Sequence, residues 1–176
     1  MPEPVDLPAW EPSARAVLHA AIRRDYAAVE AALGRIGQDW WNDVPEILIV
    51  WTTWAIDYAA RSSGSGTTAA PGAAILPTWI IAGKDGAPPH VATSADDPAL
   101  NEVDRWSGRF MAACACDDWD TVDALVGVVI ERGDVGFWSA CVSGVLSASA
   151  EMIRQARAGN LAGVVAFPDA ERHGLR

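Results

Sequence analysis

Apolar side chains recur at helical spacing along most of this chain. From Ser13 to Arg24 they follow the i, i+3, i+4, i+7 spacing of one helix face, at the positions Ala14, Val17, Leu18, Ala21 and Ile22. No long stretch alternates apolar and polar residues as a half-buried strand would. The pattern therefore predicts an all-α fold, a helical bundle of about six helices.

Glycine, proline and aspartate mark the expected ends of these helices. Gly37 is expected to close the second helix, because glycine is favoured just after a helix end. The third helix is expected from Pro45 to Arg61, and the fourth from Pro98 with Asp97 as its cap. The other helices are expected over residues 13–24, 26–36, a stretch ending near 133, and about 134–159.

The composition divides the chain into two helical units. Helical patterns occupy residues 13–61 and 97–159, and the polar stretch "SSGSGTTAAPG" follows the first of them. We interpret residues 62–96 as a Gly/Ser/Pro-rich linker with a short apolar segment, and the pattern leaves the conformation of 73–96 open. The two units are expected to share one core. The flanking segments are an N-terminal arm, 1–12, and a C-terminal tail, 160–176.

One local pattern occurs twice. The sequence "RRDYAAVEAAL" starts at residue 23, and "CDDWDTVDALV" starts at residue 116, an offset of 93. This offset aligns Asp25 with Asp118 and Tyr26 with Trp119, and a third helix follows each copy at a similar distance. We interpret the units as an internal duplication, although two alanine-rich hairpins with an aspartate cap would also look similar. We expect each aspartate to cap a helix and each ring to pack across its hairpin.

The charge of the chain limits its partners. Thirteen Lys and Arg residues face 23 Asp and Glu residues, a formal charge of -10. Because phosphate contacts need cations, we expect no binding to nucleic acid or to an anionic membrane. No apolar run approaches the ~20 residues that span a bilayer, and the start of the chain does not resemble a signal peptide, so we expect a cytoplasmic protein. The charge suits a basic partner, or simply solubility.

No motif in the sequence predicts catalysis, a metal or a cofactor. Cys114, Cys116 and Cys141 are odd in number and lack a common zinc spacing, so we interpret them as reduced thiols in apolar surroundings. The histidines have no triad spacing around them. Four clustered carboxylates are explained more simply by helix capping than by magnesium binding; they are Asp117, Asp118, Asp120 and Asp123.

Tryptophan is over-represented, with nine copies against three phenylalanines. Most of these rings are expected to face inward on helices: Trp51, Trp54, Trp106, Trp119 and Trp138. Trp40 and Trp41 are adjacent and point in different directions, so we expect one to be exposed and to bind a partner. The alternative is a ring folded back over the core. Trp79 would extend the same surface.

These observations favour a non-catalytic, acidic all-α module for protein–protein interaction or regulation. Its partner is expected to be another protein, with a basic one favoured by charge, and a homodimer is left open. One alternative is a small-molecule binding protein or enzyme with an apolar, tryptophan-lined pocket between the units. Another is an acidic inhibitor of a basic, nucleic-acid-binding partner.

Overall fold

The computed structural model describes residues 7–62 and 100–159 in full, together with the backbone of four short strands. The fold is all-α, as predicted, with six α-helices in the described residues. Their bounds are α1 Glu11–Ile22, α2 Tyr26–Asp39, α3 Val44–Ser62, α4 Glu102–Ala115, α5 Trp119–Arg132 and α6 Val135–Arg157, with a 3-10 helix η1 at Trp41–Asp43. Two antiparallel strand pairs join β1 (Ala74–Leu76) to β4 (Val165–Phe167), and β2 (Trp79–Ile81) to β3 (His90–Ala92).

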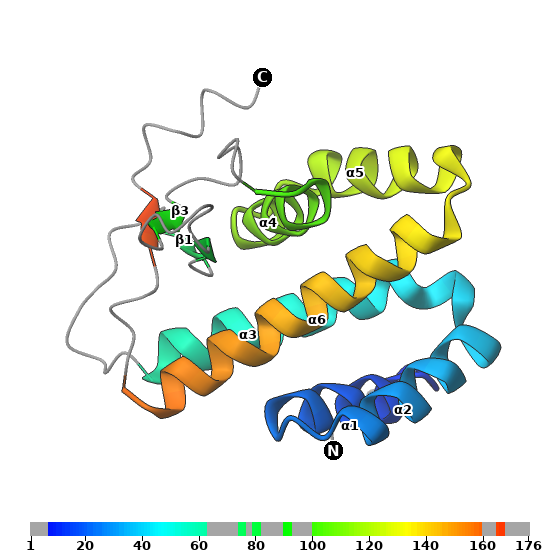
Figure 1. Ribbon diagram of the computed structural model, residues 1–176, viewed down its shortest axis with the longest axis horizontal. Helices are drawn as coiled ribbons and strands as arrows, with labels where there is room; N and C mark the ends of the chain where they lie inside the picture. Colours follow the sequence, from blue (N-terminus) through cyan, green and yellow to red (C-terminus); the bar gives the residue numbers. More distant parts are fainter. Residues whose placement is uncertain are drawn as a thin grey trace, which may run out of the picture.

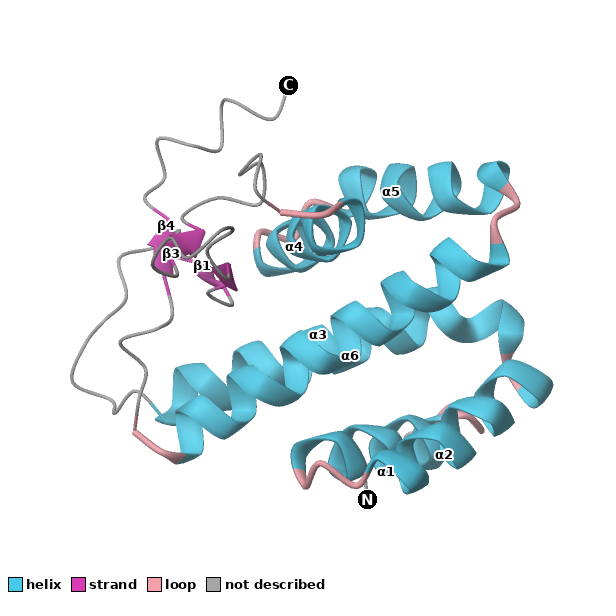
Figure 2. Ribbon diagram, in the orientation of Figure 1, coloured by secondary structure: helices cyan, strands magenta, loops and turns pink. Residues whose placement is uncertain are grey.

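The helices are arranged around a central pair. Helices α3 and α6 lie side by side, make the largest helix–helix interface, and run in the same direction (Figure 1). The α1–α2 hairpin covers one side of this pair, and the α4–α5 hairpin covers the other (Figure 2). Helix α1 contacts both α3 and α6, and α4 also contacts both, so each hairpin packs against helices of both predicted units. The six helices therefore form one bundle.

One hydrophobic core runs through the bundle. The Trp51 ring is completely buried, and its Nε1–H donates to the Ala14 carbonyl oxygen at 2.8 Å, which ties α3 to α1. Both units supply fully buried side chains to one cluster: Val17, Ile47, Leu48, Phe110, Met111, Val122, Val129, Cys141, Val145 and Met152. Burial of this kind stabilises by ~1.5–3 kcal/mol for each large aliphatic or aromatic side chain.

The predicted aspartate caps are present at both hairpins. Asp25 Oδ1 accepts from the Ala28 backbone N–H at 3.1 Å, and Asp118 Oδ1 accepts from the Thr121 N–H at 3.2 Å. Each bond satisfies a donor in the first turn of a helix that has no intrahelical partner. The caps therefore fix where α2 and α5 begin.

The two hairpin turns also share a backbone conformation. Arg24 and Asp117, the residues before the caps, have φ angles of 59° and 54°. The Asp25 N–H donates to the Ala20 carbonyl at 3.0 Å, and the Asp118 N–H donates to the corresponding carbonyl at 2.9 Å. Helices α2 and α5 are each 14 residues long. This likeness agrees with the offset of 93, while a common origin of the units stays a prediction.

Two predicted helix ends differ from the structure. Helix α2 continues through Gly37 and ends where the Trp40 N–H donates to the Ile36 carbonyl at 2.8 Å. Glycine lowers helix propensity but closes a helix only in a left-handed conformation, which Gly37 does not adopt. Helix α4 begins at Glu102 because Asn101 caps it through the Asp104 N–H at 2.8 Å. The predicted cap at residues 97 and 98 lies outside the described residues.

The rings after the aspartate caps do not pack across their hairpins. Tyr26 is 75% exposed and Trp119 is 46% exposed, so both predictions of inward packing are wrong. Each ring is on the first residue of its helix, at the very end of the hairpin, where the partner helix has already ended. Val122, three residues further along α5, occupies the inward position instead.

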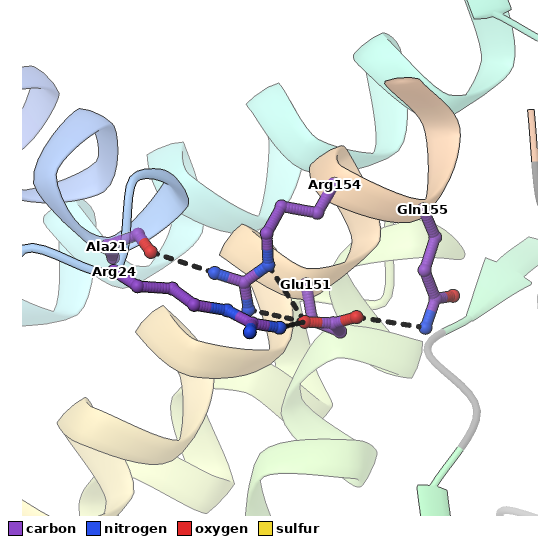
Figure 3. A network of polar contacts seen from close by, with 5 residues as sticks. All are labelled: Ala21, Arg24, Glu151, Arg154 and Gln155. Atoms are coloured by element: carbon purple, nitrogen blue, oxygen red, sulfur yellow. Dashed lines mark hydrogen bonds and ion pairs between the residues drawn. The ribbon is translucent and has the colours of Figure 1, made fainter. Parts of the chain in front are cut away.

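A polar network attaches α6 to the α1–α2 turn (Figure 3). Arg154 Nη1 donates to the Ala21 carbonyl oxygen at 2.9 Å, and the same guanidinium pairs with Glu151. The Glu151 carboxylate also lies 4.0 Å from Arg24 and accepts from Gln155 at 3.4 Å. The hydrogen bond from Arg154 lowers the pKa of Glu151 below its ordinary value, and burial opposes this in part.

Within the described residues, no helix combines the length and the apolar character needed to cross a membrane.

Candidate functional site

The connection between α2 and α3 positions the two adjacent tryptophans that the sequence singled out. Helix α2 ends at Asp39, and Trp40 leaves helical geometry with φ of -135°. One turn of 3-10 helix follows, in which the Asp43 N–H donates to the Trp40 carbonyl at 3.0 Å. Helix α3 then starts at Val44, whose side chain is buried. The connection is short and hydrogen-bonded, so it holds the rings in defined places.

The two rings have different environments. Trp40 is half-buried against the core cluster, whereas Trp41 is 46% exposed. The expectation that one of the pair would be exposed is confirmed, and Trp41 is that residue. Trp79 is the first residue of β2, but its side chain lies outside the described residues.

Trp41 is the exposed end of a row of aromatic rings that leads into the core. Its ring meets Trp138 on α6 edge to face, with centroids 6.5 Å apart. Trp138 meets Trp106 on α4 in the same manner at 6.0 Å, and Trp106 stacks on Phe110 at 5.2 Å. Edge-to-face and offset-stacked pairs each contribute ~0.5–1.5 kcal/mol beyond burial. The row fixes the exposed ring against a rigid support.

The buried members of this row are themselves held by the helices. Trp106 Nε1–H donates to the Leu125 carbonyl oxygen on α5 at 3.1 Å, which satisfies the indole N–H and joins two helices. Trp138 is buried, and Val135 lies three residues before it in the first turn of α6. Val135 is 65% exposed. Trp41 contacts Trp138 directly and Val135 lies one helical turn before Trp138, so both exposed apolar side chains lie near the buried Trp138 ring.

Several carboxylates lie close in the sequence to these two exposed residues. Asp39, Asp43 and Glu46 lie within five residues of Trp41, and none of the three forms an ion pair with a residue that the structure describes. Asp134 caps α6 beside Val135 by accepting from the Phe137 N–H at 2.9 Å. We call Trp41, Val135 and these four carboxylates, with Asp134 included, the Trp41 surface.

An arginine beside the Trp41 surface is already engaged. Arg132 Nη1 donates to Glu102 Oε1 at 2.7 Å, and its Nε lies 3.8 Å from Asp134. The guanidinium also sits 4.3 Å from the Phe137 ring centroid. Because these contacts neutralise the arginine locally, the Trp41 surface keeps an acidic character.

The connection after α5 is built differently from the connection after α2. At the offset of 93, Trp40 and Trp41 align with Gly133 and Asp134. Gly133 closes α5 with φ of 65°, and Asp134 caps α6, so two small residues complete that turn. After α2 the chain instead passes through Trp40 and the 3-10 turn Trp41–Asp43 before α3 begins, so the two connections differ in length and conformation.

The other chemistry-bearing residues are dispersed. Cys114 and Cys141 are buried, and burial raises the pKa of each thiol to about 12, so both are protonated near neutral pH. Cys116 is exposed, which corrects the expectation of three thiols in apolar surroundings. Across residues 7–62 and 100–159, no three His, Cys, Asp or Glu side chains gather as they would around a metal ion.

Comparison with known proteins does not assign a family, since no protein-family model, curated protein or solved structure matches the chain. The functional argument therefore depends on the Trp41 surface itself.

Proposed function

We propose that this protein is a non-catalytic interaction module, and that the Trp41 surface binds a basic segment of another protein. The observation that carries the proposal is the position of Trp41, which is 46% exposed and yet fixed edge to face on buried Trp138.

A fixed, exposed indole suits recognition of a protein. Tryptophan is enriched among the residues that dominate protein interfaces, because a large ring buries much area and loses few rotamers on binding. The contact with Trp138 already restricts the Trp41 ring in the free protein, so less conformational entropy is lost on binding. Val135, exposed one helical turn before Trp138 on α6, adds apolar area. Together they provide a small hydrophobic centre of the kind that a partner covers.

The carboxylates select a basic partner. Asp39, Asp43 and Glu46 would face cationic side chains across the interface, and the charge of -10 raises the rate of encounter with a basic protein. A lysine or arginine placed over the Trp41 face adds ~0.5–2 kcal/mol by a cation–π interaction. Exposed ion pairs add only ~0.2–1 kcal/mol each, so they contribute selectivity more than affinity.

Two peptides of equal length and opposite charge test this proposal. One alternates leucine with arginine and the other alternates leucine with glutamate, and binding of each is measured by calorimetry. The arginine peptide should bind, and Trp41→Ala should weaken binding by about thirtyfold, since loss of a central interface ring costs ~2 kcal/mol or more. Val128→Ala is the control, because that apolar side chain is 64% exposed and belongs to neither of the surfaces to which binding is assigned. Equal binding of the two peptides, or equal loss in the two variants, would contradict the proposal.

We also propose a cytoplasmic location. All three cysteines of the chain lie in the described residues and are free thiols, which fits a reducing compartment. Mass spectrometry of protein isolated under acid quench should find the thiols reduced. A cysteine found in a disulfide with another molecule would argue against this location.

A further inference from the structure

The α1–α2 and α4–α5 turns have one shape and opposite charges. We call residues 23–26 the arginine turn and residues 116–120 the aspartate turn. Arg24 and Asp117 occupy equivalent left-handed positions, with φ angles of 59° and 54°. The cap residues after them agree as closely, at φ and ψ of -85° and 80° for Asp25 and -87° and 75° for Asp118.

Each turn exposes both an aromatic ring and charged side chains. The arginine turn presents Arg23, Arg24 and the 75% exposed ring of Tyr26. The aspartate turn presents exposed Asp117 and Asp120 beside the 46% exposed ring of Trp119. An exposed ring on a hairpin end contributes little to the fold of the monomer. Rings exposed at two equivalent sites are therefore available for contact with another molecule.

The charges on the two turns complement each other. The Arg24 side chain is 65% exposed, and its guanidinium lies 4.0 Å from the Glu151 carboxylate, so it keeps donors for a second carboxylate. Asp117 makes no ion pair within the described part of the chain. Placed against the aspartate turn, Arg24 would meet both the Asp117 carboxylate and the face of Trp119.

We propose that the arginine turn of one copy binds the aspartate turn of a second copy, so that the protein forms a homodimer. In Figure 1, α2 runs in the direction opposite to α3, and α5 runs from α4 back toward the start of α6. A two-fold axis that places the arginine turn of one copy on the aspartate turn of the other also makes the reciprocal contact, so the contact forms twice. The surface involved lies at the opposite end of α2 from Trp41 and is independent of the proposed function.

The net charge of the chain limits this association but does not prevent it. Two copies of charge -10 repel each other at long range. At ~0.15 M salt the Debye length is about 8 Å, so distant charges are screened while pairs in contact persist. The dimer is therefore expected to be concentration-dependent and to weaken at very low ionic strength.

Exchange of the two turn residues tests the proposal. The variants are Arg24→Asp and Asp117→Arg, and each puts into a turn the residue that the equivalent position already carries in the same backbone conformation. Wild type should show a monomer–dimer equilibrium in analytical ultracentrifugation. Each variant alone should associate at least about tenfold more weakly, because like charges then face each other across both contacts.

An equimolar mixture of the two variants should restore the dimer, since every contact again joins Asp to Arg. Trp119→Ala should weaken wild-type association, and melting temperatures confirm that each variant is folded. If one variant does not fold, Arg24→Gln and Asp117→Asn test the loss of each charge. The proposal is overturned by a wild type that stays monomeric, by single variants that dimerise as wild type does, or by a mixture that remains monomeric. A monomeric protein whose Asp117→Arg variant loses binding of the arginine peptide would assign the aspartate turn to a basic partner instead.

Discussion

Helices α4 and α6 approach each other closely at Gly144, and this contact makes a sharp prediction. A Cβ atom at Gly144 would lie 2.5 Å from Ser107 Oγ, 3.3 Å from Val103 Cγ1 and 3.6 Å from Ser107 Cβ. The first distance is far inside van der Waals contact, and the last is an ordinary one. Gly144→Ala should therefore force Ser107, Val103 or the helices to move.

The expected cost follows from two opposing effects. Overpacking a close contact costs ~1–3 kcal/mol, whereas alanine in place of glycine inside a helix contributes ~1 kcal/mol of stability. Ser107→Ala removes the clashing oxygen, which has no hydrogen-bond partner within the described residues. The double variant therefore removes the closest contact, leaves Val103 Cγ1 at 3.3 Å, and keeps the helical gain. We expect the double-mutant cycle to show a favourable coupling of ~1–2 kcal/mol.

Urea unfolding of wild type, both single variants and the double variant measures this coupling. Gly34→Ala is the control, because a Cβ atom there meets nothing within 4 Å and should stabilise by ~1 kcal/mol. The close contact between α4 and α6 is refuted if Gly144→Ala stabilises the protein as much as Gly34→Ala does, and if adding Ser107→Ala leaves the stability of the Gly144→Ala variant unchanged. A coupling free energy near zero in the double-mutant cycle would also refute it.

Three further predictions concern the caps, the thiols and the polar network. Replacing either Asp25 or Asp118 by Ala should lower the free energy of unfolding by ~1 kcal/mol, because a helix cap is lost. Unchanged melting temperatures in both variants would exclude the capping role. Iodoacetamide should label only Cys116 in the native protein, because Cys114 and Cys141 are buried and burial raises the pKa of each thiol. All three cysteines should be labelled after denaturation. Rapid labelling of all three in the native protein would contradict this burial. Because the pKa of Glu151 is lowered in the folded protein, its carboxylate stabilises the fold at pH values above the ordinary carboxyl pKa of ~4.3. This stabilisation is lost as the pH falls through the folded-state pKa. The difference in unfolding free energy between wild type and Glu151→Gln should therefore shrink on acidification. A pH-independent difference would assign the effect to packing.

Features that depend on local spacing could be predicted from the sequence. The long apolar stripe of α3 and the aspartate caps of α2 and α5 require only neighbours within one or two turns. The end of α2 could not be predicted, because a helical glycine and a helix-closing glycine look alike until the backbone is known.

The candidate site was predicted only in part, because it depends on contacts between distant segments. Adjacent tryptophans predict that one ring is exposed, and Trp41 confirms it. A contact between η1 and α6, which are almost a hundred residues apart in the sequence, determines that Trp41 is the exposed ring and that Trp138 supports it. The exposure of Tyr26 and Trp119 depends similarly on where each hairpin ends.

The indole N–H resonances of the protein test the central claim most directly. A titration with the leucine–arginine peptide, followed by proton–nitrogen NMR, should shift the Trp41 indole signal, which is identified by its disappearance in Trp41→Phe. The Trp51 indole donates to the Ala14 carbonyl inside the core and should stay in place as an internal reference. A Trp41 signal that shifts while the Trp51 signal stays fixed supports the Trp41 surface as the binding site. A Trp41 signal that does not move while another indole signal does would contradict it.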